Sequence, residues 1–569
     1  MTIVRRLLLA VVFVTIAGCQ TTTNVDTLIR DVDWFDGSGA PSQRVSIAIH
    51  EGRVVAIGDL SNYRSDDTID GDGRALAPGF IDLHSHADLI LLADAERRAE
   101  LLEAKIRQGV TTLVVGNCGL GVAPADEPTA ALLSGINQWM TPQEIAAGTL
   151  TVGAYLDRLQ NSDPPLNVAT LVPHGPLRIE AMGLTDGAPD AAQLEAMQRR
   201  LREALSDGAF GLSVGLIYPP GMFSDTDELT ALASTVSAEN GLFTAHIRGS
   251  SETLLDAVDE LVTIATDSGA RTHHSHLEAV GRDYWDDVAT ILEREDAARS
   301  DGVTLSHDVF PYERAATMMA AIFPPWSLDG GVPQLLERLR DPATRERIRR
   351  DIAEQRPEWP PWQPGGWPHN LVSAVGWDGI LVASVGSEAH RDWVGRSLSE
   401  LATEHQTTPF DLVADLMLAE GGAVGQLVAE ISGDALPQIV AHPASAIVSD
   451  AEDYGRGVPH PAHAGAFARA LRMAREHSIE MTSMLHKMTQ RPATILGTSE
   501  VGELQVGDVA DLVLFDPAAV HDRADWNDPR AFASGIDAVM IGGAWVVRDG
   551  AYRPTGNGRV LRATAEPPS

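Results

Sequence analysis

The sequence is poor in lysine and cysteine. Its two lysines are Lys105 and Lys487, and arginine supplies the rest of the 43 basic side chains, which face 79 acidic ones. The net charge of −36 excludes nucleic acid as a sensible partner, because a polyanion would be repelled. The two cysteines, Cys19 and Cys118, are too few for a disulfide framework. After the first nineteen residues, no apolar run is long enough to cross a membrane.

The first nineteen residues have the pattern of an export signal. Arg5 and Arg6 precede an apolar run at 7–16 that is too short to span a bilayer. The sequence IAGC at 16–19 resembles a bacterial lipobox, which implies cleavage before Cys19 and acylation of that cysteine. We therefore expect an exported protein, anchored to a bacterial membrane by lipid and facing the periplasm. A plain secretory signal and a short anchor are the alternatives.

Period-two alternation predicts β-structure near both ends of the chain. Residues 45–49 and 54–57 alternate around a Glu-Gly turn, which is a hairpin pattern. Residues 510–515 and 539–547 follow the same rule. We expect these segments to combine into one small β-domain, which requires the two ends of the chain to meet in space.

Between the ends, short apolar runs alternate with longer helical segments. This is the pattern of βα units around a parallel sheet, and eight such strands close a (β/α)8 barrel. The eight candidate strands are 76–86, 110–119, 167–175, 209–216, 241–248, 271–278, 303–312 and 445–451. The predicted fold class is therefore α/β, a TIM barrel with a small β-sandwich domain built from both chain ends.

This reading divides the chain into segments. The predicted segments are a lipoprotein signal peptide (1–18), a tether (19–25), the two parts of the small β-domain (26–75 and 496–560) and the barrel (76–495), with an insertion around 318–440. Within the insertion, the stretch 356–368 is rich in proline, tryptophan and glycine, which favours an irregular but ordered loop.

Metal-binding residue types fall at the ends of the predicted strands. In strand order they are His84 and His86 (first), Cys118 (second), His246 (fifth), His276 (sixth) and Asp450 (eighth). In a parallel barrel these ends converge on the face where active sites lie. Imidazole, thiolate and carboxylate are all ordinary zinc ligands. Each residue alone has a structural alternative, such as a buried cysteine or a helix-capping aspartate, but their joint placement favours a metal centre.

Longer motifs surround these residues. They are APGFIDLHSH at 77–86, QGVTT at 108–112, GNCG at 116–119, GLS at 211–213, GLIYPPG at 215–221, TAHIR at 244–248, SH at 275–276, DVFPY at 308–312, SD at 449–450, MT at 488–489, RPA at 491–493 and VGDVAD at 506–511. From about residue 26 to about residue 550 the chain resembles the amidohydrolase superfamily, and more closely its D-aminoacylase (N-acyl-D-amino-acid deacylase) family. The GNCG segment is the most specific of these motifs.

The resemblance implies a two-position metal centre. Cys118, His246 and His276 would hold a tightly bound Zn²⁺, and His84, His86 and Asp450 would line a second, weaker position. Many amidohydrolases bridge two metals with a carboxylated lysine at the end of the fourth strand. Here 209–216 contains no lysine, so Cys118 is the natural substitute. Zinc would polarise the scissile carbonyl, and Asp450 would act as the general base.

Five further residues are predicted to contact the substrate: Tyr218, Arg248, Glu278, Tyr312 and His174. Tyr218 or Tyr312 would help to stabilise the developing oxyanion. His174 ends the predicted third strand, and Arg248 follows the fifth.

The chain departs from the family where a substrate carboxylate would bind. The family lysine two residues after the sixth-strand histidine is Glu278 here, and the family arginine after His-Pro is Ala462. The usual glutamate two residues after Arg248 is Ser250. These changes disfavour a free carboxylate at that place, unless Arg248 or Arg314 supplies a substitute charge. Alternatively, Glu278 orients a zinc-binding histidine.

The leading hypothesis is a zinc-dependent hydrolase that cleaves a non-peptide amide C–N bond of a small N-acyl or amide substrate. A cyclic amidase of the hydantoinase or dihydroorotase kind, or a dipeptidase, would use the same scaffold. A metal-binding lipoprotein without catalysis is the third reading. Asp450 argues against it, because a binding protein needs no general base.

Overall fold

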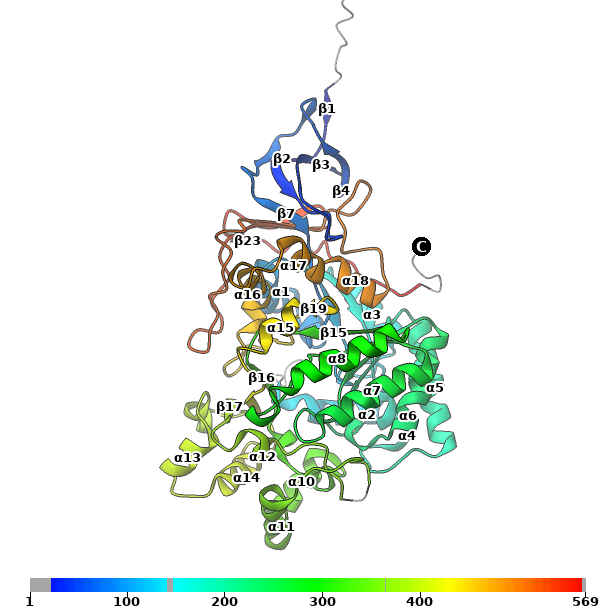
Figure 1. Cartoon of the computed structure of the whole chain (residues 1–569), viewed down its shortest axis with the longest axis vertical. Coiled ribbons are helices and arrows are strands. Elements are labelled where there is room, and N and C mark those ends of the chain that lie inside the picture. The colour runs from blue at the N-terminus through cyan, green and yellow to red at the C-terminus, as the bar shows by residue number, and fades with distance from the viewer. Residues whose placement is uncertain (1–21, 141–146, 364, 565–569) are drawn as a thin grey trace, which may run out of the picture.

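The computed structural model describes residues 22–140, 147–363 and 365–564. The predicted signal peptide and Cys19 lie outside the described residues. Among the described helices, none combines the length and the apolar character that a membrane crossing requires. A helix-covered barrel lies at the centre, with a sheet from both chain ends at one pole and the insertion at the other (Figure 1).

The barrel contains parallel strands at all eight predicted places. They fall into the sheets β10-β9-β8 and β11-β12-β13-β14-β15-β19. The third strand joins the two sheets, because it is interrupted only at Leu171, whose N–H donates to Val115 O at 2.9 Å. The bounds are β8 (Phe80–Asp82), β9 (Val110–Val115), β10 (Asn167–Thr170), β11 (Val172–Pro173), β12 (Gly211–Gly215), β13 (Leu242–His246), β14 (Arg271–His274), β15 (Leu305–Val309) and β19 (Ser445–Ile447).

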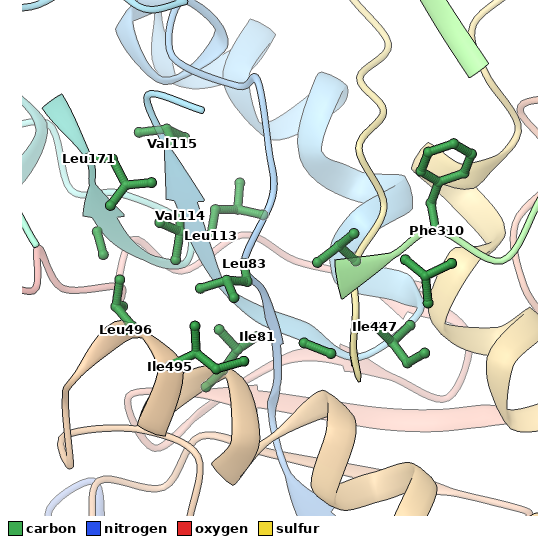
Figure 2. Close-up of a cluster of buried hydrophobic side chains, with 14 of the residues drawn as sticks. Ile81, Leu83, Leu113, Val114, Val115, Leu171, Phe310, Ile447, Ile495 and Leu496 are labelled. Carbon is green, nitrogen blue, oxygen red and sulfur yellow. The ribbon is translucent and has the colours of Figure 1, made fainter. Parts of the chain in front are cut away.

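Amphipathic helices cover the barrel. In α7 (Leu254–Ser268), the buried residues recur every three or four positions, which places one apolar stripe against the strands. The other covering helices are α1 (Ala95–Arg107), α3 (Val152–Gln160), α4 (His174–Met182), α5 (Ala191–Ser206), α6 (Thr226–Ala238), α8 (Asp287–Ser300), α15 (Leu436–Ala441), α16 (Ala462–Glu476), α17 (Met481–Met488) and α18 (Gln490–Leu496). Figure 2 shows Ile495 and Leu496 of α18 packed near Ile81 and Leu113 of the first two strands.

The strands from both chain ends form one nine-stranded sheet over a shared hydrophobic core. Its members are β2 (Thr27–Trp34), β3 (Gln43–His50), β4 (Arg53–Gly58), β6 (Asp67–Asp70), β7 (Ala75–Pro78), β20 (Leu512–Phe515), β21 (Ile536–Ile541), β22 (Ala544–Arg548) and β23 (Ala551–Tyr552). The predicted hairpin is confirmed, because β3 pairs with β4 in antiparallel fashion. The two ends meet at β7, which pairs with β2 on one side and β20 on the other.

One predicted strand is corrected. The run 76–86 was expected to be the first barrel strand, but it divides at Pro78-Gly79 into β7 and β8. Leu76 and Ala77 pair with Leu514 and Val513 in the terminal sheet. The proline cannot donate to a ladder, and the glycine beside it lets the chain leave one sheet for the other.

The insertion forms a separate layer. Its antiparallel sheet, in the order β16-β18-β17, consists of β16 (Arg314–Met318), β17 (Ile380–Ser384) and β18 (Gly425–Ala429). Its helices are α9 (Pro325–Leu328), α10 (Gly331–Arg340), α11 (Pro342–Glu354), α12 (Leu371–Val375), α13 (Leu398–Glu404) and α14 (Pro409–Ala419). The described residues of 356–368 contain no helix or strand, as predicted, and Trp367 there is 1% exposed. The core of this layer includes Cys118 and Tyr218, so it packs on the barrel end that carries the predicted metal ligands.

A buried ion network links the first and last barrel strands. Lys105 Nζ of α1 lies 2.8 Å from Asp82 Oδ2 and 3.1 Å from Glu452 Oε1. Ser449 N–H donates to Asp82 Oδ1 at 2.9 Å. All three charged side chains are at most 3% exposed, so each charge depends on the others for compensation.

We expect Lys105→Met to lower the free energy of unfolding by about 3–5 kcal/mol, because it leaves two buried carboxylates without a cation. Urea unfolding followed by tryptophan fluorescence measures the change. The control is Arg349→Met, which breaks an exposed pair with Glu346 and should change the value by about 0.5 kcal/mol or less. A loss below about 1 kcal/mol for Lys105→Met would show that the network contributes little.

Candidate metal centre

The six predicted metal ligands converge at one end of the barrel. Three sets of donor atoms each lie within 4.8 Å of one another. The sets are His84–His86–Cys118, Cys118–His246–His276 and His84–His276–Asp450. Cys118 Sγ is 3.2 Å from His84 Nε2, 3.6 Å from His276 Nε2 and 3.8 Å from His246 Nδ1. The thiol is therefore the central atom of the cluster.

Asp450 completes the cluster from the eighth strand. Its Oδ1 lies 3.4 Å from His84 Nε2 and 3.3 Å from His86 Nε2. Its own N–H donates to His84 O at 3.1 Å, which fixes the segment after β19 against the end of the first strand. The Asp450 side chain is 17% exposed, so it is open to the cavity, while the His84 side chain beneath it is 1% exposed.

Three of the six residues have a left-handed backbone. The φ angles are 53° at Cys118, 37° at His276 and 44° at Asp450. Such angles are unusual for residues with a Cβ, cost about 1–3 kcal/mol each, and cluster at functional sites. Each residue lies just beyond its strand, where the turn directs the side chain toward the barrel axis instead of continuing the strand alternation.

The charge of the cluster favours a thiolate. Burial raises the pKa of the Cys118 thiol, but the positive charge of His84 and hydrogen bonds with His246 and His276 hold that pKa well below its usual range. Burial lowers the pKa of His84, but the charges of Asp450 and Cys118 raise it well above its usual value. The thiolate is the form of cysteine that binds metal.

Two carboxylates orient the histidines from behind. Asp308 Oδ2 lies 3.3 Å from His84 Nδ1, and its Oδ1 accepts the backbone N–H of His276 at 2.5 Å. Glu278 Oε2 lies 3.1 Å from His276 Nδ1. A ring nitrogen held in this way fixes the tautomer and leaves the opposite nitrogen to bind a metal. The prediction that Glu278 orients a histidine therefore agrees with the geometry.

A cavity opens above the cluster. His86, Cys118, His246, His276 and Asp450 form its polar floor. Its walls are mostly apolar and come from both the barrel and the insertion; they include Leu120, Trp139, Met140, Ile217, Val280, Leu371 and Val428. Tyr218 also lines it, with its hydroxyl 2.8 Å from Thr317 Oγ1 and its ring 5.2 Å from the ring of His246. Polar groups converging under an apolar wall are typical of a small-molecule site.

Two of the five predicted substrate contacts, Tyr218 and Glu278, line this cavity, and three do not. His174 begins α4 instead of ending the third strand, and its Nε2 lies 2.8 Å from Glu228 Oε1. Arg248 lies beyond the end of β13, fully buried, with its guanidinium on the carboxylate of Glu260.

Tyr312 is the third correction. It lies beyond the end of β15, and its ring packs against His460, outside the cavity. Arg314, the other candidate for a substitute charge, also lies outside the lining. In each case the strand ends before the residue, so strand alternation does not determine where the side chain points.

Sequence reasoning missed several residues of the site. Asp308 stood in a recognised motif but received no role, although its place on β15, beside β14, was a usable signal. Glu430, His369 and Arg456 line the cavity from the insertion and from the loop after Asp450. No periodicity or motif marked them, because their approach depends on how the insertion folds over the barrel.

The donor set fits zinc. It combines one thiolate, four imidazoles and one carboxylate, all of them zinc ligand types, with histidine orientation already provided by Asp308 and Glu278. Neither lysine of the chain can bridge two metal ions at this site. Lys105 is engaged in its ion network, and Lys487 donates to His442 O.

The comparisons with known proteins agree with this geometry. The amidohydrolase family pattern matches residues 67–347 and 410–547, and the gap between the two matched ranges lies within the insertion. N-acyl-D-glutamate deacylase of Alcaligenes xylosoxydans xylosoxydans is 32% identical over 545 residues, which cover 95% of this chain and 97% of that protein.

Two solved structures are similar to this chain. One is N-acyl-D-glutamate deacylase from Bordetella bronchiseptica, which was solved in complex with zinc and a phosphonate inhibitor that mimics the reaction tetrahedral intermediate. It matches with a TM-score of 0.77 and 31% identity, and the match covers 95% of this chain and 100% of that chain. A D-aminoacylase structure described as defining a novel subset of amidohydrolases matches with the same TM-score of 0.77, 28% identity and the same coverage of 95% and 100%.

We expect Cys118→Ala to reduce zinc affinity about 100-fold, because a structural zinc site gains about 10–16 kcal/mol from roughly four ligands. Zinc content after dialysis, measured by inductively coupled plasma mass spectrometry, tests this. His369→Gln is the control, because His369 lines the cavity but belongs to none of the three donor sets. Full zinc retention in Cys118→Ala would remove the thiol from the centre.

Proposed function

This chain belongs to the amidohydrolase family, and within it to the D-aminoacylase group. We propose that it is a zinc-dependent deacylase, which hydrolyses the amide bond of N-acyl-D-amino-acid derivatives. The observation that carries the proposal is the position of Asp450. Its carboxylate stands at the floor of the cavity, within 3.4 Å of two histidines of the metal cluster.

Cys118, His246 and His276 would hold the tightly bound zinc, and His84, His86 and Asp450 the second position. When bound, zinc supplies a Lewis acid that polarises the scissile carbonyl and acidifies water. The relative from Bordetella bronchiseptica that carries zinc is similar over 95% of this chain, which supports the choice of metal.

Asp450 moves the proton. Burial raises its pKa, but the positive charge of His84 and a hydrogen bond with His86 lower it below the usual value, so the carboxylate is ionised at neutral pH. It accepts a proton from the attacking water and returns it to the leaving nitrogen. A protein that only binds metal needs no general base.

The cavity walls recognise the rest of the substrate. The apolar side chains of Leu120, Ile217 and Val280 suit an acyl chain or an apolar amino-acid side chain. Tyr218 is placed to donate a hydrogen bond to the oxyanion as it develops, since its hydroxyl lies among the lining residues beside Thr317.

We also propose that the protein is exported and anchored by a lipid at Cys19, facing the periplasm. The basic pair Arg5-Arg6, the short apolar run and the IAGC segment support this. The folded body would then be joined to the membrane surface by the few residues between Cys19 and β1 (Thr23–Asn24). The predicted tether at 19–25 is therefore too long, because β1 pairs with β5 (Tyr63–Arg64) and Val25 packs in a hydrophobic cluster. Loss of Arg5 and Arg6 on cleavage makes the net charge more negative than −36, which keeps the folded body away from anionic lipid.

We expect Asp450→Asn to lower kcat about 10²–10⁴-fold, because the general base is lost while the ligands of the tightly bound zinc remain. Hydrolysis of N-acetyl-D-leucine and N-acetyl-D-leucinamide, together with zinc content, measures the effect. Asp453→Asn is the matched control, because this nearby carboxylate pairs with Arg530 and does not line the cavity. Unchanged turnover in Asp450→Asn would contradict its role as the base.

We expect Cys19→Ser to release the protein from the membrane fraction of a bacterial host, because serine cannot form the lipid thioether. Fractionation and immunoblotting, with mass spectrometry of the N-terminus, measure the result. Cys118→Ser serves as the control and should stay membrane-bound. Equal membrane retention of Cys19→Ser and the parent would overturn the anchor.

A further inference from the structure

A second buried glutamate lies beside Glu278 in the cavity. Glu430 follows β18 of the insertion, is 4% exposed and lines the cavity. Its carboxyl group is a neighbour of that of Glu278, and both side chains line the same cavity. The other carboxyl oxygen, Oε2, is buried and has no hydrogen-bond partner among the described residues. A buried polar atom without a partner is costly, and at a cavity wall it points to a ligand group.

Glu278 itself has its oxygens engaged. Its Oε1 accepts a hydrogen bond from Ser250 Oγ at 2.5 Å, and its Oε2 faces His276 Nδ1 at 3.1 Å. Glu430 is therefore the member of the pair with an oxygen to offer to a substrate.

The pair places two carboxyl groups side by side at one wall of the cavity. Both side chains line the cavity, with Glu278 6% exposed and Glu430 4% exposed. A carboxylate oxygen can only accept a hydrogen bond, so the unpartnered Glu430 Oε2 is an acceptor beside a second carboxyl group.

The cavity holds little positive charge to offset this pair. Among the described residues that line the cavity, Arg456 is the one lysine or arginine. Arg456 also borders an adjoining hollow, and its Nη2 donates to Val385 O at 3.0 Å. Burial lowers the pKa of His369 and of His460 to about 4, so both are neutral near pH 7.

We propose that Glu430, supported by Glu278, is a specificity-determining residue that accepts a hydrogen bond from an N–H group of the substrate, so that the cavity takes N-acyl-D-amino-acid amides or N-acylated diamines in preference to free N-acyl-D-amino acids. A carboxylate placed there would bring two acceptors together beside an existing negative charge. This inference rests on the proposed function and names its substrate class.

The first test compares four substrates on the zinc-loaded full chain. They are N-acetyl-D-leucinamide, N-acetyl-D-leucine, N-acetyl-D-leucine methyl ester and N-acetylethylenediamine. We expect kcat/KM for the carboxamide to exceed that for the free acid about 100-fold or more, with the ester between them because it has neither the charge nor the donor. The diamine shows whether a cationic donor serves as well as a neutral one. A free acid that equals or exceeds the carboxamide would overturn the proposal.

Variants of Glu430 separate hydrogen bonding from general disruption. Glu430→Leu removes the acceptor and should reduce the carboxamide-to-acid ratio about tenfold or more, with zinc content unchanged. Glu430→Gln can still donate to Glu278 and keep a carbonyl acceptor, so the ratio should stay close to that of the parent. Glu420→Gln is the control, because this insertion glutamate pairs with His390 away from the cavity. An unchanged ratio in Glu430→Leu would overturn the assignment of Glu430.

Failure of the proposed function would give a different result. If the zinc-loaded chain hydrolyses none of the four compounds, deacylation itself is excluded for this class. Calorimetric binding of D-leucinamide and D-leucine still tests the selectivity. Tighter binding of D-leucinamide, weakened in Glu430→Leu, supports it, and tighter binding of D-leucine overturns it.

Discussion

The geometry of the site depends on the buried cation of Lys105. Among the described strands, no ladder joins β8 to β19, so the barrel is closed at this seam by other contacts. Lys105 holds Asp82 before the first two histidines and Glu452 after Asp450. Glu452 in turn accepts hydrogen bonds from Ser85 Oγ at 2.6 Å and from His86 N–H at 3.1 Å. This ammonium group acts together with the hydrogen bond from Asp450 N–H to His84 O, and both hold together the two strand ends that carry half of the metal ligands.

The thiolate of Cys118 imposes the second constraint. It stands within 3.8 Å of three histidines, in a chain that has no lysine on its fourth barrel strand. Its left-handed backbone brings the chain close to β12, where a Cβ at Gly215 would lie 2.0 Å from Cys118 O. Glycine is therefore required at that position. The strain at Cys118, His276 and Asp450 persists because hydrogen bonds such as that from His276 N–H to Asp308 hold the turns in place.

The insertion forms much of the cavity wall above the metal cluster. The barrel supplies the floor, while β16, β18 and the segment around His369 supply much of the wall. Its own hydrophobic core includes Cys118 and Tyr218, so the wall and the floor share side chains and are positioned together. The predicted metal ligands thus lie at the strand ends of the barrel, whereas Glu430 reaches the cavity wall from the insertion.

The sequence by itself determined the barrel, the terminal β-domain and the six residues of the metal cluster. The strands follow from periodicity. The cluster follows from the rule that parallel strands present their carboxyl ends on one face and from the motifs around its residues, such as GNCG at 116–119. Only the tertiary structure shows that Arg248 forms an ion pair with Glu260, that His174 contacts Glu228, and that Glu430 lines the cavity. Their side chains lie beyond strand ends or in the insertion, where direction is set by packing between segments distant in sequence and not by local alternation.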